Sequence, residues 1–116
     1  MGGSTRATER TGASTDRGVR AGFARVELDL RAFAPRELGM FGWGDPSQRV
    51  EGVITPLHAR AMLLDEGAVR VALVCLELGL VTWPVRIGVL DGLAQRPHLA
   101  LGPHHVMLSA THTHCG

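Results

Sequence analysis

The sequence predicts an α/β fold: a partial mixed sheet with a hairpin and one right-handed strand-helix-strand crossover, preceded by a disordered N-terminal tail. Segment 23–30 alternates apolar and charged residues, which predicts a strand with one solvated face. Segment 69–78 is almost continuously apolar, as is typical of a strand buried on both faces. Helical spacing over 82–96, followed by a second apolar run at 106–109, predicts a crossover between parallel strands.

The composition places the chain among ordinary globular proteins. Its 116 residues suffice for one domain, and 12 basic and 11 acidic residues leave a formal net charge of +1. This balance gives no indication of nucleic-acid or anionic-membrane binding. No apolar run approaches the roughly 18–20 residues of a membrane helix. The two cysteines, Cys75 and Cys115, are too few for a disulfide framework, which favours a reducing compartment.

The N-terminal segment is expected to differ from the rest of the chain. Residues 1–22 are rich in Gly, Ser, Thr, Arg and Glu, so they have little apolar surface to offset the entropy of ordering. We therefore expect a disordered tail over 1–22 and one ordered unit over 23–116. The start also lacks the apolar core of a secretory signal, so the sequence by itself predicts a cytoplasmic protein.

A glycine-rich loop follows the first predicted strand, between Pro35 and Pro46. Its large apolar residues Met40, Phe41 and Trp43 are interspersed with glycines, which predicts a shaped loop whose backbone can approach another group closely. Two roles remain open for these side chains: they plug the core, or they face a substrate.

The middle of the chain predicts the hairpin and the helix. Segment 53–65 is apolar, 65–68 has the composition of a turn, and 69–78 is expected to be the hairpin partner and the central strand. Thr82 is placed to cap the helix by accepting from a backbone N–H, and the dipeptide Arg96-Pro97 is expected to end it.

The last segment carries the clearest chemical signal. His112 and His114 are two residues apart, so on an extended segment their side chains point to the same side. Neutral imidazole is the commonest protein metal ligand, and zinc takes three or four N, O or S ligands, so the pair predicts half of a zinc site. Glu77 closes the adjacent predicted strand, and the carboxyl ends of parallel strands meet at one edge. We therefore expect one carboxylate and two imidazoles at this rim.

Other roles for these residues remain open. The N–H groups of a His-x-His pair also commonly satisfy backbone carbonyls. Glu77 either forms an ion pair with an arginine such as Arg60 or supports the site as a hydrogen-bond partner of a ligand or as an acid/base. Cys115, beside the imidazoles, is a candidate thiolate nucleophile or ligand, whereas Cys75 is expected in the core. The remaining histidines are expected on the surface or in loops: His58, His98, His104 and His105.

Several motifs together resemble the neutral/alkaline, non-lysosomal ceramidase family. Residues 109–116, Ser-Ala-Thr-His-Thr-His-Cys-Gly, are similar to the start of the family motif Ser-x-Thr-His-Thr-His-Ser-Gly-Pro. Met-Phe-Gly-Trp at 40–43 is similar to Met-Met-Gly-Tyr, and Leu-His-Ala-Arg-Ala at 57–61 to Leu-x-Ala-Arg-Ala. Residues 74–81 resemble Val-Ser-x-Asp-Leu/Ile-Gly-Met-Val, and all of these occur in the family's order and spacing.

The resemblance implies an N-terminal fragment of a zinc amidase that cleaves the N-acyl bond of ceramide. By position, His112 is implied to be a zinc ligand and His114 a catalytic residue that stabilises the substrate or the transition state. Met40, Phe41 and Trp43 would then form a wall for the acyl chain or the long-chain base. The family's remaining ligands, a histidine, a glutamate and a tyrosine, are expected beyond the last residue of this chain, which contains no tyrosine.

Two departures from the family pattern bear on specificity. Cys115 stands where serine is usual and Glu77 where aspartate is usual, so the preferred lipid amide can differ from ceramide. Two other functions are consistent with the residues alone. One is a different His-x-His metallohydrolase, and the other is a non-catalytic α/β module in which the histidines cap a strand.

Overall fold

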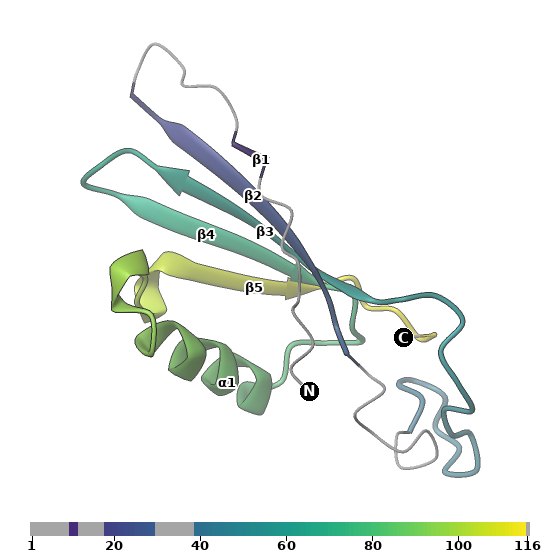
Figure 1. Ribbon diagram of the computed structural model, residues 1–116. Helices are drawn as coiled ribbons and strands as arrows, with labels where there is room; N and C mark the ends of the chain where they lie inside the picture. The colour runs from purple at the N-terminus through teal and green to yellow at the C-terminus, as the bar shows by residue number, and fades with distance from the viewer. Residues whose placement is uncertain (1–9, 12–17, 30–38, 116) are drawn as a thin grey trace, which may run out of the picture.

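The chain forms a mixed α/β structure, described here from a computed structural model for residues 10–11, 18–29 and 39–115. Five strands form one sheet in the order β1-β2-β3-β4-β5, and one α-helix packs beside it (Figure 1). The pairs from β1 to β4 are antiparallel, whereas β4 and β5 are parallel, so the predicted mixed sheet is confirmed. The handedness of the crossover stays a prediction. The elements are β1 (Arg10–Thr11), β2 (Arg20–Glu27), β3 (His58–Asp65), β4 (Arg70–Leu76), α1 (Trp83–Ala94), the 3-10 turns η3 (Pro97–Leu99) and η4 (Pro103–His105), and β5 (Val106–Ala110).

The first long strand begins earlier than the composition predicts. β2 spans Arg20–Glu27, so the predicted start of the strand at Phe23 is wrong, and Arg10 pairs with Phe23 from within the expected tail. The division into a tail over 1–22 and an ordered unit over 23–116 stays a prediction. The reason is that β3 offers backbone partners along its whole length, for example Leu63 opposite Gly22, and backbone pairing needs no apolar side chain. The rest of the expected tail, 1–9 and 12–17, lies outside the described residues.

The predicted hairpin is confirmed, and Asp65 holds its turn together. β3 and β4 pair from Asp65 opposite Arg70 to Ala59 opposite Leu76. The Asp65 carboxylate accepts the backbone N–H of Gly67 at 2.8 Å, and Arg20 and Arg70 lie 3.0 and 3.2 Å from its second oxygen. The hydrogen bond from Gly67 is the largest cause that lowers the pKa of Asp65, and the two arginines add to it.

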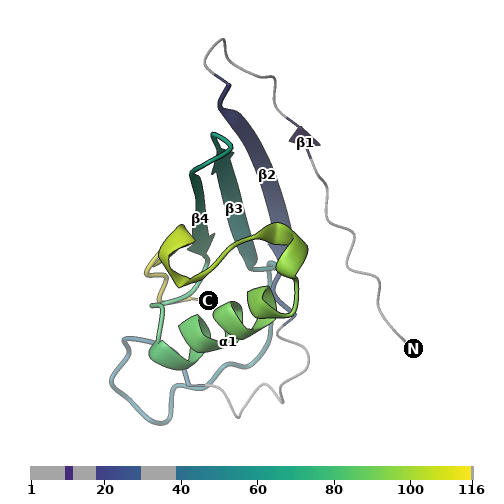
Figure 2. The ribbon, with the colours of Figure 1, turned by 90° about the vertical axis from the view of Figure 1, so that its left-hand side faces the viewer.

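The core lies between the sheet and α1. Ala72, Leu76 and Val106 are its most buried apolar side chains, and they come from β4 and β5. Figures 1 and 2 show α1 lying along one face of these strands. The connection from β4 through α1 to β5 therefore buries one side of the parallel pair.

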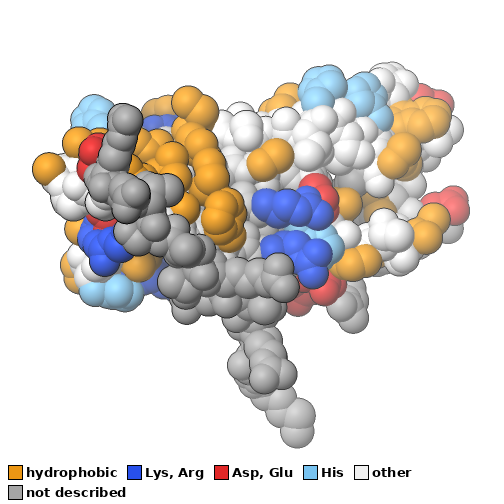
Figure 3. Space-filling model, turned by 90° about the horizontal axis from the view of Figure 1, so that it is seen from above, with side chains coloured by type: hydrophobic (Ala, Val, Ile, Leu, Met, Phe, Trp, Pro, Cys, Tyr) orange, Lys and Arg blue, Asp and Glu red, His pale blue; other side chains and the backbone are white. Residues whose placement is uncertain are grey.

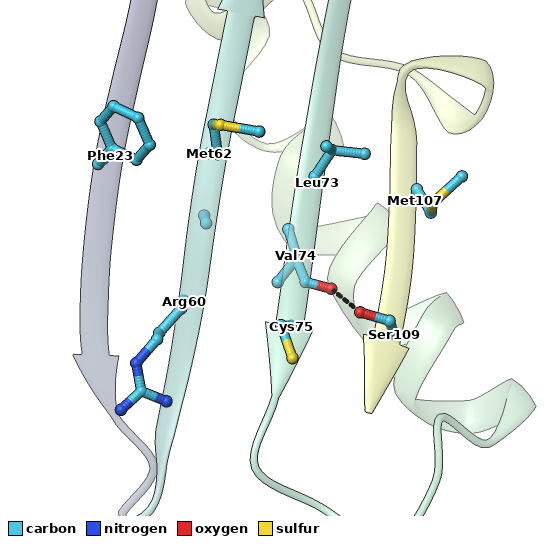
Figure 4. Close-up of a pocket in the computed structure, with 9 residues that line it drawn as sticks. Phe23, Arg60, Met62, Leu73, Val74, Cys75, Met107 and Ser109 are labelled. Carbon is cyan, nitrogen blue, oxygen red and sulfur yellow. Dashed lines mark hydrogen bonds between the residues drawn. The ribbon is translucent and has the colours of Figure 1, made fainter. Parts of the chain in front are cut away.

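The opposite face of the sheet is open. Phe23, Met62, Leu73 and Met107 lie in direct register across four strands, on the side away from α1 (Figure 4). Phe23 and Met107 are 48% and 63% exposed, and Figure 3 shows apolar side chains gathered on this face. The prediction of a strand buried on both faces is thus wrong within the described part of the chain, because α1 covers one side only. The middle strand of the five is β3, whereas β4 lies one strand from the edge.

The helix begins where predicted but is capped differently. Thr82 is the N-cap in an extended conformation, but its side chain makes no capping hydrogen bond, so that expectation is wrong. The Thr82 carbonyl instead accepts the N–H of Arg86 at 3.1 Å, which starts the helical ladder. Among the described residues, no helix has the length and apolar character required to cross a membrane.

Shortening a core side chain is expected to destabilise the fold. Leu76 is 5% exposed, so Leu76→Ala should lower the free energy of unfolding by about 2–4 kcal/mol, measured by urea denaturation. Leu80→Ala is the matched control, because Leu80 is 43% exposed and should lose less than about 1 kcal/mol. Equal losses in the two variants would contradict the assignment of the core.

The Asp65 turn predicts a specific acid sensitivity. A carboxyl group whose pKa is lowered in the folded state stabilises the fold above its ordinary pKa of 3.8, and this contribution is lost as the pH falls through the lowered value. Asp65→Asn should therefore be less stable than the wild type at pH 7 and show a smaller loss between pH 5 and pH ~2. The urea midpoint measures both effects. Asp91→Asn, at an exposed position of α1, is the control and should keep the wild-type urea midpoint at pH 7.

Candidate functional site

The parallel pairing of β4 and β5 brings their carboxyl ends to one edge of the sheet. The backbone hydrogen bonds continue past β5, since Thr111 N–H donates to the Leu76 carbonyl at 2.9 Å and His112 N–H to the Leu78 carbonyl at 3.0 Å. Residues 77–79 and 111–114 therefore lie beside each other as a rim beyond the strands. This is the place where open α/β sheets form ligand crevices.

The two histidines meet at this rim, although not through strand alternation. β5 ends at Ala110, and His112 adopts a left-handed backbone conformation with φ 60°. The prediction that an extended segment aligns the two side chains is therefore wrong. The imidazoles are nonetheless neighbours, with ring centroids 5.1 Å apart and planes at 69°, and both residues are exposed. A left-handed non-glycine residue costs roughly 1–2 kcal/mol, which the surrounding contacts must offset.

Phe41 completes a cluster of three rings with the histidines. Its ring centroid lies 5.2 Å from that of His112 and 5.3 Å from that of His114, in edge-on geometry in both cases. The ring cluster, Phe41 with His112 and His114, rests on Gly79, where a Cβ atom would lie 2.3 Å from Phe41 Cδ1. The glycine-rich loop is thus packed on the rim. Trp43 of the loop and His114 of the rim are 71 residues apart in sequence.

The neighbours of Phe41 also contact the histidine segment. Gly42 has φ 80°, and a Cβ atom there would lie 2.2 Å from Nδ1 of His114. Trp43 donates its indole N–H to the His114 carbonyl at 3.1 Å, and its side chain stays 52% exposed. Met40 is half-buried, and its N–H donates to the Gln48 carbonyl at 3.3 Å. The structure therefore brings Phe41 and Trp43 to the histidines, whereas the sequence left open whether this loop faces a substrate or plugs the core.

Glu77 follows β4 at the rim, but its carboxylate faces β3. One oxygen accepts the His58 N–H at 2.6 Å and lies 3.2 Å from His58 Nδ1, while the other accepts from Arg60. The hydrogen bond from Arg60 is the main cause that lowers the pKa of Glu77, and it outweighs the opposing effect of burial. The ion pair with Arg60, one of the two roles left open, is confirmed.

The expected rim of one carboxylate and two imidazoles is not formed in the described part of the chain. No group of three or more His, Cys, Asp or Glu residues there is placed to hold a metal ion. Glu77 is directed to β3 because the hairpin register sets it beside His58, whose carbonyl accepts the Glu77 N–H at 3.0 Å. A role for Glu77 in supporting the metal ligands stays a prediction.

His58 is the partner that sequence reasoning missed, since it was expected to be a surface histidine. Counting back from the turn could have found it: Asp65 opposite Arg70 and Ala59 opposite Leu76 place His58 next to Glu77. The two cysteines are free, with Cys75 half-buried and Cys115 exposed. The N–H of Cys115 donates to the Thr113 hydroxyl at 3.2 Å.

The histidine pair suits zinc in donor type and separation. Zinc accepts imidazole nitrogen at about 2.0–2.1 Å in tetrahedral geometry, which puts the centres of two bound rings roughly 5 Å apart. The observed separation of 5.1 Å agrees with this. The pair is thus compatible with zinc in donor type and separation, and the described residues offer no third ligand beside it.

Comparison with known proteins identifies relatives of the whole arrangement. Residues 33–116 match the family model described as neutral/alkaline non-lysosomal ceramidase, N-terminal. The chain is 34% identical over 82 residues to a neutral ceramidase of Pseudomonas aeruginosa, covering 69% of this chain and 12% of that protein. It is 35% identical over 81 residues to neutral ceramidase 3 of Arabidopsis thaliana, covering 69% of this chain and 11% of that protein.

The fold agrees with a solved structure from the same group. The crystal structure of neutral ceramidase from Pseudomonas aeruginosa superposes with a TM-score of 0.74 at 29% identity, covering 86% of this chain and 16% of that one. The chain thus spans less than a fifth of the length of these relatives. Because the family model covers most of the chain, this protein belongs to the neutral/alkaline, non-lysosomal ceramidase family and corresponds to its N-terminal part.

Proposed function

We propose that the chain is the N-terminal part of a zinc-dependent amidase that hydrolyses the N-acyl bond of ceramide or a related lipid amide. The observation that carries the proposal is the exposed pair of imidazoles, with centroids 5.1 Å apart, at the rim of a chain that belongs to this family. The relatives named above are neutral ceramidases, which supports ceramide as the substrate class.

Each histidine has a separate role in this proposal. His112, as neutral imidazole, is a zinc ligand. His114, whose ring is its immediate neighbour, hydrogen-bonds the amide group and stabilises the charge that develops on its oxygen. Bound zinc supplies a water with a pKa near 7 and polarises the scissile carbonyl. The chain's own contribution is to hold the two imidazoles at one exposed edge, where a substrate can reach both.

The glycine-rich loop is proposed to face the lipid. Trp43 presents more than half of its side chain to solvent, while its N–H is fixed on the His114 carbonyl. An indole anchored in this way offers an apolar surface next to the reacting groups. Phe41 lies beside both imidazoles, and Met40 precedes it in the same loop, so we assign all three residues to the wall for the acyl chain or the long-chain base.

The remaining zinc ligands are proposed to follow Gly116 in the complete protein. The chain matches only 11–16% of the length of the relatives, and the described part supplies two imidazoles. Of these, His112 is the one proposed zinc ligand, which is fewer than the three or four that zinc requires in a stable protein site. We therefore expect weak zinc binding and no hydrolysis from these 116 residues alone.

Zinc titration tests the role of His112. We expect weak binding near one equivalent of Zn²⁺ by calorimetry, and His112→Ala should lower the affinity at least about tenfold, because loss of even an outer-shell partner of a metal ligand has that effect. His104→Ala, at an exposed position in η4, should bind like the wild type. Absence of both bound zinc and amidase activity from a chain extended to full length would favour the non-catalytic alternative.

The wall is tested by removing the indole. In the full-length enzyme, Trp43→Ala should raise KM for a long-chain ceramide and change KM less for a short-chain analogue, because the long chain loses more apolar contact. Trp83→Ala is the control, since Trp83 is also exposed but lies at the start of α1. Unchanged KM and kcat for the long-chain substrate would remove Trp43 from the substrate wall.

A further inference from the structure

We propose that Gly42 and Phe41 are positioning residues that hold the His114 imidazole beside that of His112. The inference deepens the proposed function and rests on it, because the position of this ring matters only if His114 acts at the rim. It assigns the glycine-rich loop a second task besides facing the lipid. That task is to fix the side chain of His114, which lies exposed beyond the end of β5.

The closest contact in this arrangement is between Gly42 and the His114 ring. A Cβ atom at position 42 would lie 2.2 Å from Nδ1 and 2.3 Å from Cε1, closer than any real side-chain contact allows. The missing side chain therefore makes the space in which the ring sits, with its Nδ1 edge against the loop. The other nitrogen, Nε2, is farther from this position than Nδ1 and Cε1 are.

Phe41 supports the ring from another direction. Its ring contacts both imidazoles edge-on, so it fills the space that they share. The Phe41 ring packs directly against Gly79. A Cβ atom at Gly79 would lie 2.3 Å from Phe41 Cδ1 and 2.4 Å from Cγ, so only glycine leaves room for the ring. The His114 ring thus packs against Gly42 in the loop, and the Phe41 ring packs against Gly79 after β4. A side chain at either position would collide with the ring.

The loop is fastened to the rim and to itself, so it can act as a fixed support. The Trp43 N–H holds the His114 carbonyl, which ties the backbone of the histidine segment to the loop. At the other end of the loop, Gly39 pairs with Arg49 in an isolated bridge. Asp45 accepts the backbone N–H of Ser47 at 2.8 Å and its hydroxyl at 2.7 Å, which orders the turn between them.

The chain contains a matched control for the contact at Gly42. Gly44 also has a positive φ, 66°, but a Cβ atom there would meet nothing within 4 Å. Gly42→Ala and Gly44→Ala therefore carry similar backbone strain. Only in Gly42→Ala does the new methyl group collide with His114. A difference between the two variants in the position of the His114 ring therefore reports the contact and not the backbone strain.

The test is an NMR measurement on the chain with labelled histidine and phenylalanine. The wild type and Gly44→Ala should show ring-to-ring NOEs between Phe41, His112 and His114, and Gly42→Ala should lose those of His114. The amide resonances of β4 and β5 should stay in place in all three, which shows that the sheet is intact. Persistence of the His114 NOEs in Gly42→Ala, or their equal loss in Gly44→Ala, would overturn the inference.

A second pair of variants keeps the test decisive if Gly42→Ala does not fold. Gly79→Ala should displace Phe41 and remove its NOEs to both imidazoles, whereas Gly39→Ala, where a Cβ atom meets nothing within 4 Å, should keep them. Retained NOEs in Gly79→Ala would contradict the role of Phe41. These measurements need no metal and no substrate, so a full-length protein that binds no Zn²⁺ would refute the proposed function while the NOEs still decide the present inference.

Discussion

The site depends on the parallel pairing of β4 and β5 and on its continuation past the strand ends. Two backbone hydrogen bonds, from Thr111 to Leu76 and from His112 to Leu78, carry the pairing beyond Ala110. They fix residues 77–79 next to 111–114, so that Gly79 and the two histidines lie at one edge of the sheet. Without this register, Gly79 could not support Phe41, and Phe41 could not contact the histidines. Ala72, Leu76 and Val106 belong to these two strands, and the burial of their side chains stabilises the pairing.

Much of the sheet could be predicted from the sequence because its signals are local. The turn at Asp65, the apolar run of β4 and the helical spacing of α1 each lie within a short segment, and they led to the correct hairpin and parallel pair. The start of β2 was misplaced because strand pairing with β3 leaves no mark in the composition of residues 20–22. The solvated face of β4 was also missed, since an apolar run does not reveal which of its sides another layer covers.

The candidate site could be predicted in its residues but not in its arrangement. The histidine pair was evident from spacing, yet its alignment comes from the left-handed backbone of His112 and from contacts with a distant loop. Glu77 was expected at the rim with the histidines, but its hydrogen bonds to His58 and Arg60 direct it to β3. Both differences have the same cause: side-chain direction at a strand end is set by tertiary partners far away in sequence.

The proposed function requires that His112, in the exposed pair of imidazoles at this rim, binds a divalent cation. Crystals of the chain soaked in Zn²⁺ and measured at the zinc absorption edge test it most directly. We expect an anomalous peak at the rim, about 2.0–2.1 Å from an imidazole nitrogen of His112 and on the side of His114. Anomalous density confined to other histidines, such as His104 or His98, with nothing at the rim, would contradict it.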